Sequence, residues 1–366
     1  MFGDFKGDRN KLRRSVAEDL LFMVNRFADD KAVVARSSYK AMQRVLSEQC
    51  EVSEDKTVVE VKAKPPTDAM ENPSDPDATY DGRKGQGYQV QIAETCAQSN
   101  DAQMITAAQP EPAHRSDQDA VQPMLDQLEA HGRKPEVLYA DTGYGSDQNV
   151  VAAEARGVDL QSPVGGNPPA AEGCLTLDDF VIDEAQETVT RCPNGCQPRS
   201  SVHDTKTGRT TTIMNESDCS VCEFQSQCPV KLCGKRYVLH HAAAQRRLAS
   251  RRAEQATEAF AENYAIRAGE ESLNSGLKRR LGMGRLRTRG QPRIRMAVLL
   301  RCAGWNLLRA LAAFAKRKKR AAAAATGVFG RFLPRWARPN AFAQLRGAIL
   351  GESAARIAVV PLPTAA

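Results

Sequence analysis

Hydrophobic and polar positions follow different periods in successive parts of the chain. In the first fifty residues the apolar positions recur every three or four residues, which predicts helices over 1–50. These positions are Val16, Leu20, Leu21, Val24 and Phe27, followed by Tyr39, Met42, Val45 and Leu46. Residues 51–84 are charged and rich in proline, with a short β-like run at 57–61. We expect a linker there.

Residues 85–165 have the pattern of an α/β domain. Apolar and polar residues alternate over 87–93, as in a half-buried strand, and 104–106 is a second short apolar run. Helical spacing over 117–131 is followed by a short apolar strand at 137–140 that ends in Asp141. Ser146 or Asp147 can cap the next helix, and 158–160 begins another strand. This alternation predicts an α/β fold.

The pattern changes again after residue 165. Residues 166–241 combine cysteine, glycine and threonine with short strands, and 242–320 return to helical spacing, with helices expected at 245–267, 272–281 and 293–319. Alanine and scattered proline from 321 to 366 suggest a flexible tail.

Composition limits the class of protein. The mean hydropathy is -0.47 and no run of 18 apolar residues occurs, so we expect no membrane span. No apolar leader follows Met1, which makes a cytoplasmic location the default. In that compartment the ten cysteines are expected to be metal ligands or buried thiols.

Positive charge is concentrated in one part of the chain. Between Lys231 and Arg320 there are 23 Lys and Arg against 5 Asp and Glu, so the rest holds 51 − 23 = 28 basic and 44 − 5 = 39 acidic residues. A solvated helix face is the ordinary explanation of a charge run. Here too few carboxylates are present to pair with the cations, which favours a nucleic-acid partner.

Two carboxylates stand where chemistry is expected. Asp141 follows a strand and precedes a glycine-rich turn, a position at which ligands gather in α/β sheets, although many such residues only cap the next helix. Glu271 shares a helix face with Lys278, which suits a metal ligand set among phosphate-binding cations or a plain surface pair.

Several motifs, in order, resemble those of bacterial insertion-sequence transposases, which have a DDE triad and an RNase-H-like core. The resemblance covers roughly 1–315. It is carried by YADTGYGS at 139–146, RAG at 267–269, Glu271, Asn274-Ser275, LKRR at 277–280 and GMGRLR at 282–287, with PSDPDATY at 73–80 and GQGYQVQ at 85–91.

The resemblance implies Asp141 as the second catalytic Asp and Glu271 as the catalytic Glu. Two Mg²⁺ or Mn²⁺ ions held ~4 Å apart would serve cleavage and strand transfer of DNA. Phosphates of double-stranded transposon ends would be bound by a basic group of residues, here called the basic segment. Its members are Lys278, Arg279, Arg280, Arg285, Arg287 and Arg289. A nucleoid-associated location follows, and a homodimer on DNA is left open.

The chain departs from that family at the first catalytic Asp. In the family this residue lies on the first and central strand, and no Asp in the first fifty residues here follows a convincing strand. We therefore expect an RNase-H-like core that lacks its first strand, in a truncated and inactive transposase. Asp75, Asp77 and Asp81 are the nearest substitutes for the missing ligand.

Residues 166–241 form a Cys-rich insert with enough thiols for one tetrahedral Zn²⁺ site. The preferred ligands are Cys192, Cys219, Cys222 and Cys228, with Cys196 the rival of Cys192 and Cys233 the rival of Cys228; free thiols are the alternative. Two other functions stay open. One is a zinc-bearing DNA-binding protein without catalysis, and the other is a divergent nuclease of the same fold.

Overall fold

The computed structural model describes residues 8–167, 171–183, 188–326 and 356–365. Its first part is a small helical unit of α1 (Arg9–Arg26), α2 (Lys31–Val34) and α3 (Ser37–Gln49), closed by a hairpin of β1 (Cys50–Val52) and β2 (Val59–Val61). Ala17, Leu21 and Leu46 are buried where α1 and α3 meet the hairpin. The expected helices are present, and the expected linker contains the hairpin.

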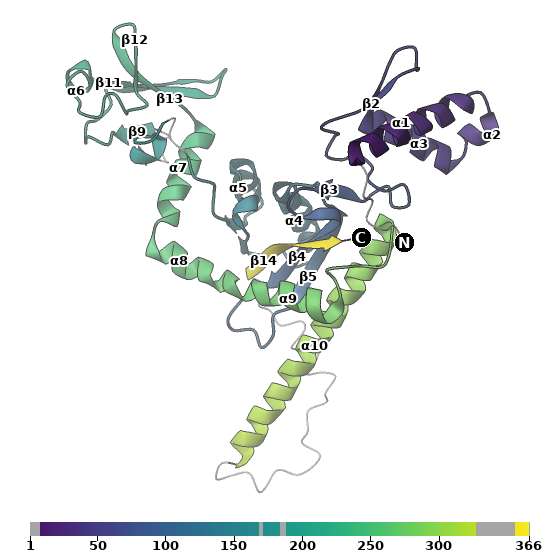
Figure 1. Cartoon of the computed structure of the whole chain (residues 1–366). Coiled ribbons are helices and arrows are strands. Elements are labelled where there is room, and N and C mark those ends of the chain that lie inside the picture. The colour runs from purple at the N-terminus through teal and green to yellow at the C-terminus, as the bar shows by residue number, and fades with distance from the viewer. Residues whose placement is uncertain (1–7, 168–170, 184–187, 327–355, 366) are drawn as a thin grey trace.

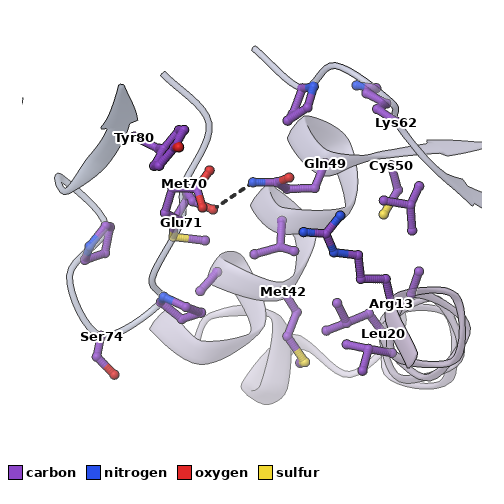
Figure 2. Close-up of a pocket in the computed structure, with 18 of the residues that line it drawn as sticks. Arg13, Leu20, Met42, Gln49, Cys50, Lys62, Met70, Glu71, Ser74 and Tyr80 are labelled. Carbon is purple, nitrogen blue, oxygen red and sulfur yellow. Dashed lines mark hydrogen bonds between the residues drawn. The ribbon is translucent and has the colours of Figure 1, made fainter. Parts of the chain in front are cut away.

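An open groove of about 1330 Å³ runs between this helical unit and the following loop. Figure 2 shows Met42 and Leu20 on its helical side, with Met70 and Tyr80 opposite. Gln49 Nε2 donates to the carbonyl of Met70 at 3.2 Å and ties the loop to α3. The groove is mainly apolar, and neither Asp141 nor Glu271 lines it.

A mixed sheet forms the centre of the molecule (Figure 1). Its strands run in the order β3-β4-β14-β6-β7. β5 also pairs with β4, on the edge that faces away from β14. β4 is antiparallel to β3, β5 and β14, whereas β6 is parallel to β14 and β7. The strands are β3 (Thr79–Asp81), β4 (Gly85–Thr95), β5 (Ile105–Pro112), β6 (Val137–Tyr139), β7 (Asp159–Gln161) and β14 (Arg356–Ala365).

The strand β14 corrects the expectation of a flexible tail over 321–366. Its residues pair with β4 from Ile357 opposite Thr95 to Ala365 opposite Gly87, and Arg356–Ala358 pair with β6. Val359 is 1% exposed. A strand therefore occupies the centre of the sheet, where the sequence analysis expected none, although it comes from the other end of the chain. The rest of the tail from 327 to 355 lies outside the described residues.

Helices cover both faces of the sheet. On one face, α9 (Glu270–Leu281) and α10 (Gln291–Thr326) bury Leu273, Leu277 and Val298 against β4 and β5. The other face is covered by α4 (Val121–Ala130), after the short η1 (Asp117–Ala120), and by α5 (Asp147–Glu154). Because both faces are covered, Gly87 to Thr95 of β4 are all buried. The prediction that this strand is half-buried was wrong.

The Cys-rich region forms a separate lobe at one end of the molecule (Figure 1). It has a four-stranded antiparallel sheet in the order β10-β11-β13-β12 and a β8-β9 hairpin. Phe180, Met214 and Leu239 lie in its own small core. The elements are η3 (Leu177–Asp179), β8 (Val181–Asp183), β9 (Thr188–Arg191), β10 (Ser200–Asp204), β11 (Arg209–Met214), α6 (Glu216–Cys219), β12 (Lys231–Cys233) and β13 (Arg236–Ala242).

Helices then return from this lobe to the sheet. α7 (Ala243–Gln255) and α8 (Glu258–Tyr264) replace the single helix expected at 245–267, because Thr257 begins a new helix by accepting the Phe260 N–H. η4 (Ala265–Gly269) leads into α9. By length and composition, Gln291–Ala321 of α10 would meet the criterion for a membrane span, a test that core helices also pass. Here α10 packs against β5 of the central sheet.

Candidate active site

Asp141 lies directly after β6 at the edge of the sheet. It caps the short η2 (Thr142–Tyr144), and its Oδ1 accepts the Thr142 N–H at 2.8 Å. The carboxylate is about half exposed, with 51% of its side-chain surface accessible. The backbone beneath it is held on both sides, since Ser162 Oγ donates to the Asp141 carbonyl at 2.5 Å and Tyr264 Oη donates to the Ala140 carbonyl at 2.9 Å. A fixed backbone thus presents a carboxylate to solvent.

The segment that precedes α9 reaches this carboxylate. Arg267 Nη2 lies 3.3 Å from Asp141 Oδ2, and Arg267 Nη1 donates to Tyr264 Oη at 3.1 Å. The Arg267 guanidinium also stands over the Tyr264 ring, 5.7 Å from its centroid. Residues more than a hundred positions away in sequence are therefore joined at the end of β6.

Glu271 is in the first turn of α9, four residues after Arg267. Its side chain lies outside the described residues, so the expected approach of the Asp141 and Glu271 carboxyl groups stays a prediction. The backbone is placed favourably for it, because the contact between Arg267 and Asp141 brings the start of α9 to the end of β6.

The basic segment runs from the last turns of α9 through the loop before α10. Gly282 ends α9 in the left-handed conformation, with φ 61°, and Met283 and Leu286 turn inward. All six cations of the basic segment are exposed; they are Lys278, Arg279, Arg280, Arg285, Arg287 and Arg289. Buried residues at 283 and 286 thus alternate with exposed arginines, which directs several positive charges to solvent.

The three aspartates considered as substitutes for the first ligand have structural partners. Asp75 is fully buried and accepts Tyr88 Oη at 2.6 Å and the Gly290 N–H at 3.0 Å. Asp77 accepts the Gln291 N–H at 3.2 Å at the start of α10. Asp81 accepts two turn amides at 2.8 Å, and these bonds lower its pKa. Each carboxylate fixes a loop or turn.

The cysteines of the insert share one region without forming a metal site in the described part of the chain. Burial first, and then the nearby thiols of Cys228, Cys192 and Cys222, raise the pKa of the Cys219 thiol to about 11. Among the described residues, however, no three His, Cys, Asp or Glu side chains are grouped so that they could hold a metal ion. The zinc prediction therefore finds no support.

The sequence analysis missed a buried polar network beneath Asp141. It runs from Tyr144, in the turn after Asp141, through Gln91 on β4 to Glu111 on β5, which also accepts Gln89. In the sequence, Gln89 and Gln91 alternate with Tyr88, Val90 and Ile92. This pattern is typical of a strand whose polar face is exposed to solvent. Buried and exposed polar residues can be told apart here only when it is known that a second layer of helices covers this face of the sheet.

Gly145 gives a direct test of how tightly the Asp141 turn is held. A Cβ at this position would lie 2.5 Å from the Pro163 carbonyl oxygen and 2.9 Å from Ser162 Oγ, the atom that holds the Asp141 carbonyl. We expect Gly145→Ala to destabilise the chain by ~1–3 kcal/mol, as overpacking does. Urea denaturation measures the change. Gly165→Ala is the control because nothing lies within 4 Å of its added Cβ; equal midpoints for the two variants would contradict the close packing.

The end of β6 thus presents an exposed carboxylate beside a helix that leads into a row of exposed cations. Residues 191–311 match the family model described as "Transposase DDE domain". This match confirms the resemblance to DDE transposases. The match covers about a third of the chain; Glu271 and the basic segment lie inside it, and Asp141 lies before it.

No curated protein matches the chain. No solved structure matches it either.

Proposed function

We propose that the chain is an insertion-sequence transposase that binds double-stranded transposon ends, with Asp141 and Glu271 as two of its catalytic carboxylates. The observation that carries this proposal is the 3.3 Å contact between Arg267 and Asp141, because it joins the region of the DDE domain match to the end of β6. The central sheet is then an RNase-H-like core in which β14 takes the place of the first strand. A cytoplasmic, nucleoid-associated location agrees with a DNA substrate.

The donor atoms near Asp141 suit a hard divalent cation. Its carboxylate is accessible, and carboxylate oxygens are the preferred ligands of Mg²⁺ and Mn²⁺. When bound, such ions activate the attacking oxygen and stabilise the leaving oxygen of phosphoryl transfer. Asp141 would hold the ion, and the basic segment would bind the phosphates. Arg267, whose Nη2 lies 3.3 Å from Asp141 Oδ2, would orient that carboxylate.

DNA binding tests the role of the basic segment. We expect affinity for duplex DNA to fall steeply with salt, by ~0.9 in log K per tenfold increase in salt for each phosphate neutralised. The triple variant Lys278→Ala, Arg279→Ala and Arg280→Ala should lower this slope by up to ~3. Fluorescence anisotropy between low and physiological salt gives both quantities.

The matched control removes the same number of charges elsewhere. Arg9, Lys11 and Arg13 are exposed on α1 in the helical unit. Their replacement by alanine changes the net charge equally and should leave most of the slope unchanged. A slope that falls equally in both triple variants would mean that the positive charge acts without a defined surface, which would contradict the proposed interface.

A further inference from the structure

We propose that Tyr144, Gln91 and Glu111 form a positioning unit that fixes the turn carrying Asp141 from inside the sheet. The inference rests on the proposed role of Asp141 and adds residues that the carboxylate assignment does not include. None of the three would touch DNA or metal; they would act through the backbone of residues 141–145.

A side-chain hydrogen bond of Tyr144 joins the turn to β4. Tyr144 Oη donates to Gln91 Oε1, and both residues are fully buried. Gln91 Nε2 in turn donates to Glu111 Oε1 at 2.8 Å and to Asp117 Oδ1 at 3.2 Å. The amide of Gln91 is therefore oriented by two carboxylates, and it offers its oxygen to the tyrosine.

Neighbouring groups hold Glu111 and Asp117 in turn. Glu111 Oε1 also accepts Gln89 Nε2 at 2.6 Å, while Lys84 Nζ lies 3.2 Å from Asp117 Oδ1 and donates to the Arg115 carbonyl at 2.9 Å. Burial raises the pKa of Glu111; Asp117 also raises it, whereas the two glutamine amides and Lys84 lower it. Gln91 thus connects the turn to the partly buried ion pair of Lys84 and Asp117.

Other residues hold the turn at further points. Asn149 Nδ2 donates to the Tyr144 carbonyl at 3.0 Å. The Asp117 side chain packs against Gly143, and it would lie 3.4 Å from a Cβ added there. Ser162 holds the Asp141 carbonyl from the neighbouring strand end. Asp141 is half exposed, so its own side chain has little packing to orient it. Besides its contacts with Arg267 and the Thr142 N–H, its direction depends on the backbone of the turn, which the buried polar network helps to fix.

A pair of tyrosine variants separates positioning from general stability. Tyr144→Phe removes only the hydroxyl that reaches Gln91. Tyr88→Phe is the matched control, because Tyr88 is equally buried on the same sheet and donates to buried Asp75 on the opposite face. Amide hydrogen exchange of the metal-free chain is measured at Tyr144, Gly145 and Ser146, whose N–H groups are bonded within the turn.

We expect exchange at these three amides to be at least ~tenfold faster in Tyr144→Phe and unchanged in Tyr88→Phe, because local opening controls exchange where a segment is held locally. Glu111→Gln should keep wild-type protection, since the amide oxygen can still accept both glutamine donors. Unchanged protection in Tyr144→Phe, or the same acceleration in Tyr88→Phe, would overturn the positioning unit.

Mn²⁺ titration adds a readout that a purely structural role would not move. Paramagnetic broadening of the Thr142 and Gly143 amide signals should require about tenfold to hundredfold more Mn²⁺ in Tyr144→Phe than in Tyr88→Phe, the range found when residues that orient metal ligands are lost. Equal requirements would count against positioning. Absence of broadening in the unaltered chain would instead remove the proposed metal role of Asp141, and the exchange experiment would still decide the positioning unit.

Discussion

A variant that ends at Thr326 is expected to lose the cooperative unfolding of the central sheet. It lacks β14, which lies between β4 and β6 and pairs with both. Its removal leaves two strand edges facing each other without partners, and each buried N–H or C=O group left unpaired costs ~1–3 kcal/mol. Since a domain has only ~5–15 kcal/mol of net stability, several such groups are enough to unfold it.

Chemical denaturation and limited proteolysis of the purified protein measure this effect. The truncated variant should be cut within 85–165 at protease concentrations that leave the full chain intact. Val359→Ala in the full chain is the graded control, because Val359 is 1% exposed in the core. Shortening this side chain should lower the free energy of unfolding by ~1–3 kcal/mol while leaving the strand pairing in place. A truncated variant with the denaturation midpoint of the full chain would show that β14 contributes no stability.

The position of β14 could not be predicted from its own sequence. Pro361 and Pro363 lack an N–H, and proline inside a strand normally indicates an edge or no strand at all. The segment therefore resembled a tail. What makes it a strand is the gap between β4 and β6, which no local pattern reveals. The α/β order of β4, α4, β6, α5 and β7 was predictable, because each element has its own period.

The candidate site was predictable to the extent that its residues stand at the ends of recognisable elements. Asp141 was found because it follows an apolar strand, and the basic segment because few acids accompany it. The contact of Arg267 with Asp141 was not predicted, since 126 positions separate them (267 − 141). Gln91 and Glu111 were missed because a polar side chain is taken to face water unless its covering layer is known.

The second large effect expected is that the unaltered chain binds DNA without appreciable Mg²⁺-dependent cleavage. β14, which pairs with β6 in the central sheet, contributes no carboxylate, because residues 356–365 contain no Asp or Glu. Asp75, Asp77 and Asp81 are engaged in loop and turn contacts. A two-metal site would then lack one of its acidic ligands, leaving charge on the attacked phosphate less compensated.

The register of β14 indicates where a third carboxylate could be added. Ala358 pairs with Tyr139 in the parallel direction, and extending this register by two residues past the end of β6 would bring position 360 beside Asp141, at the ~4.8 Å spacing of neighbouring strands. We expect Val360→Asp to tighten Mn²⁺ binding by at least ~tenfold, because affinity for hard cations rises with the number of charged oxygen ligands. Val360→Asn is the control, with similar shape and no charge.

Binding is followed by broadening of the Thr142 amide signal, and cleavage by nicking of labelled duplex carrying the transposon ends. Equal affinity in the two variants would show that position 360 does not reach the ion. Efficient metal-dependent cleavage by the unaltered chain would show that another acid completes the site, and replacing Asp75, Asp77 and Asp81 singly by Asn would then identify it.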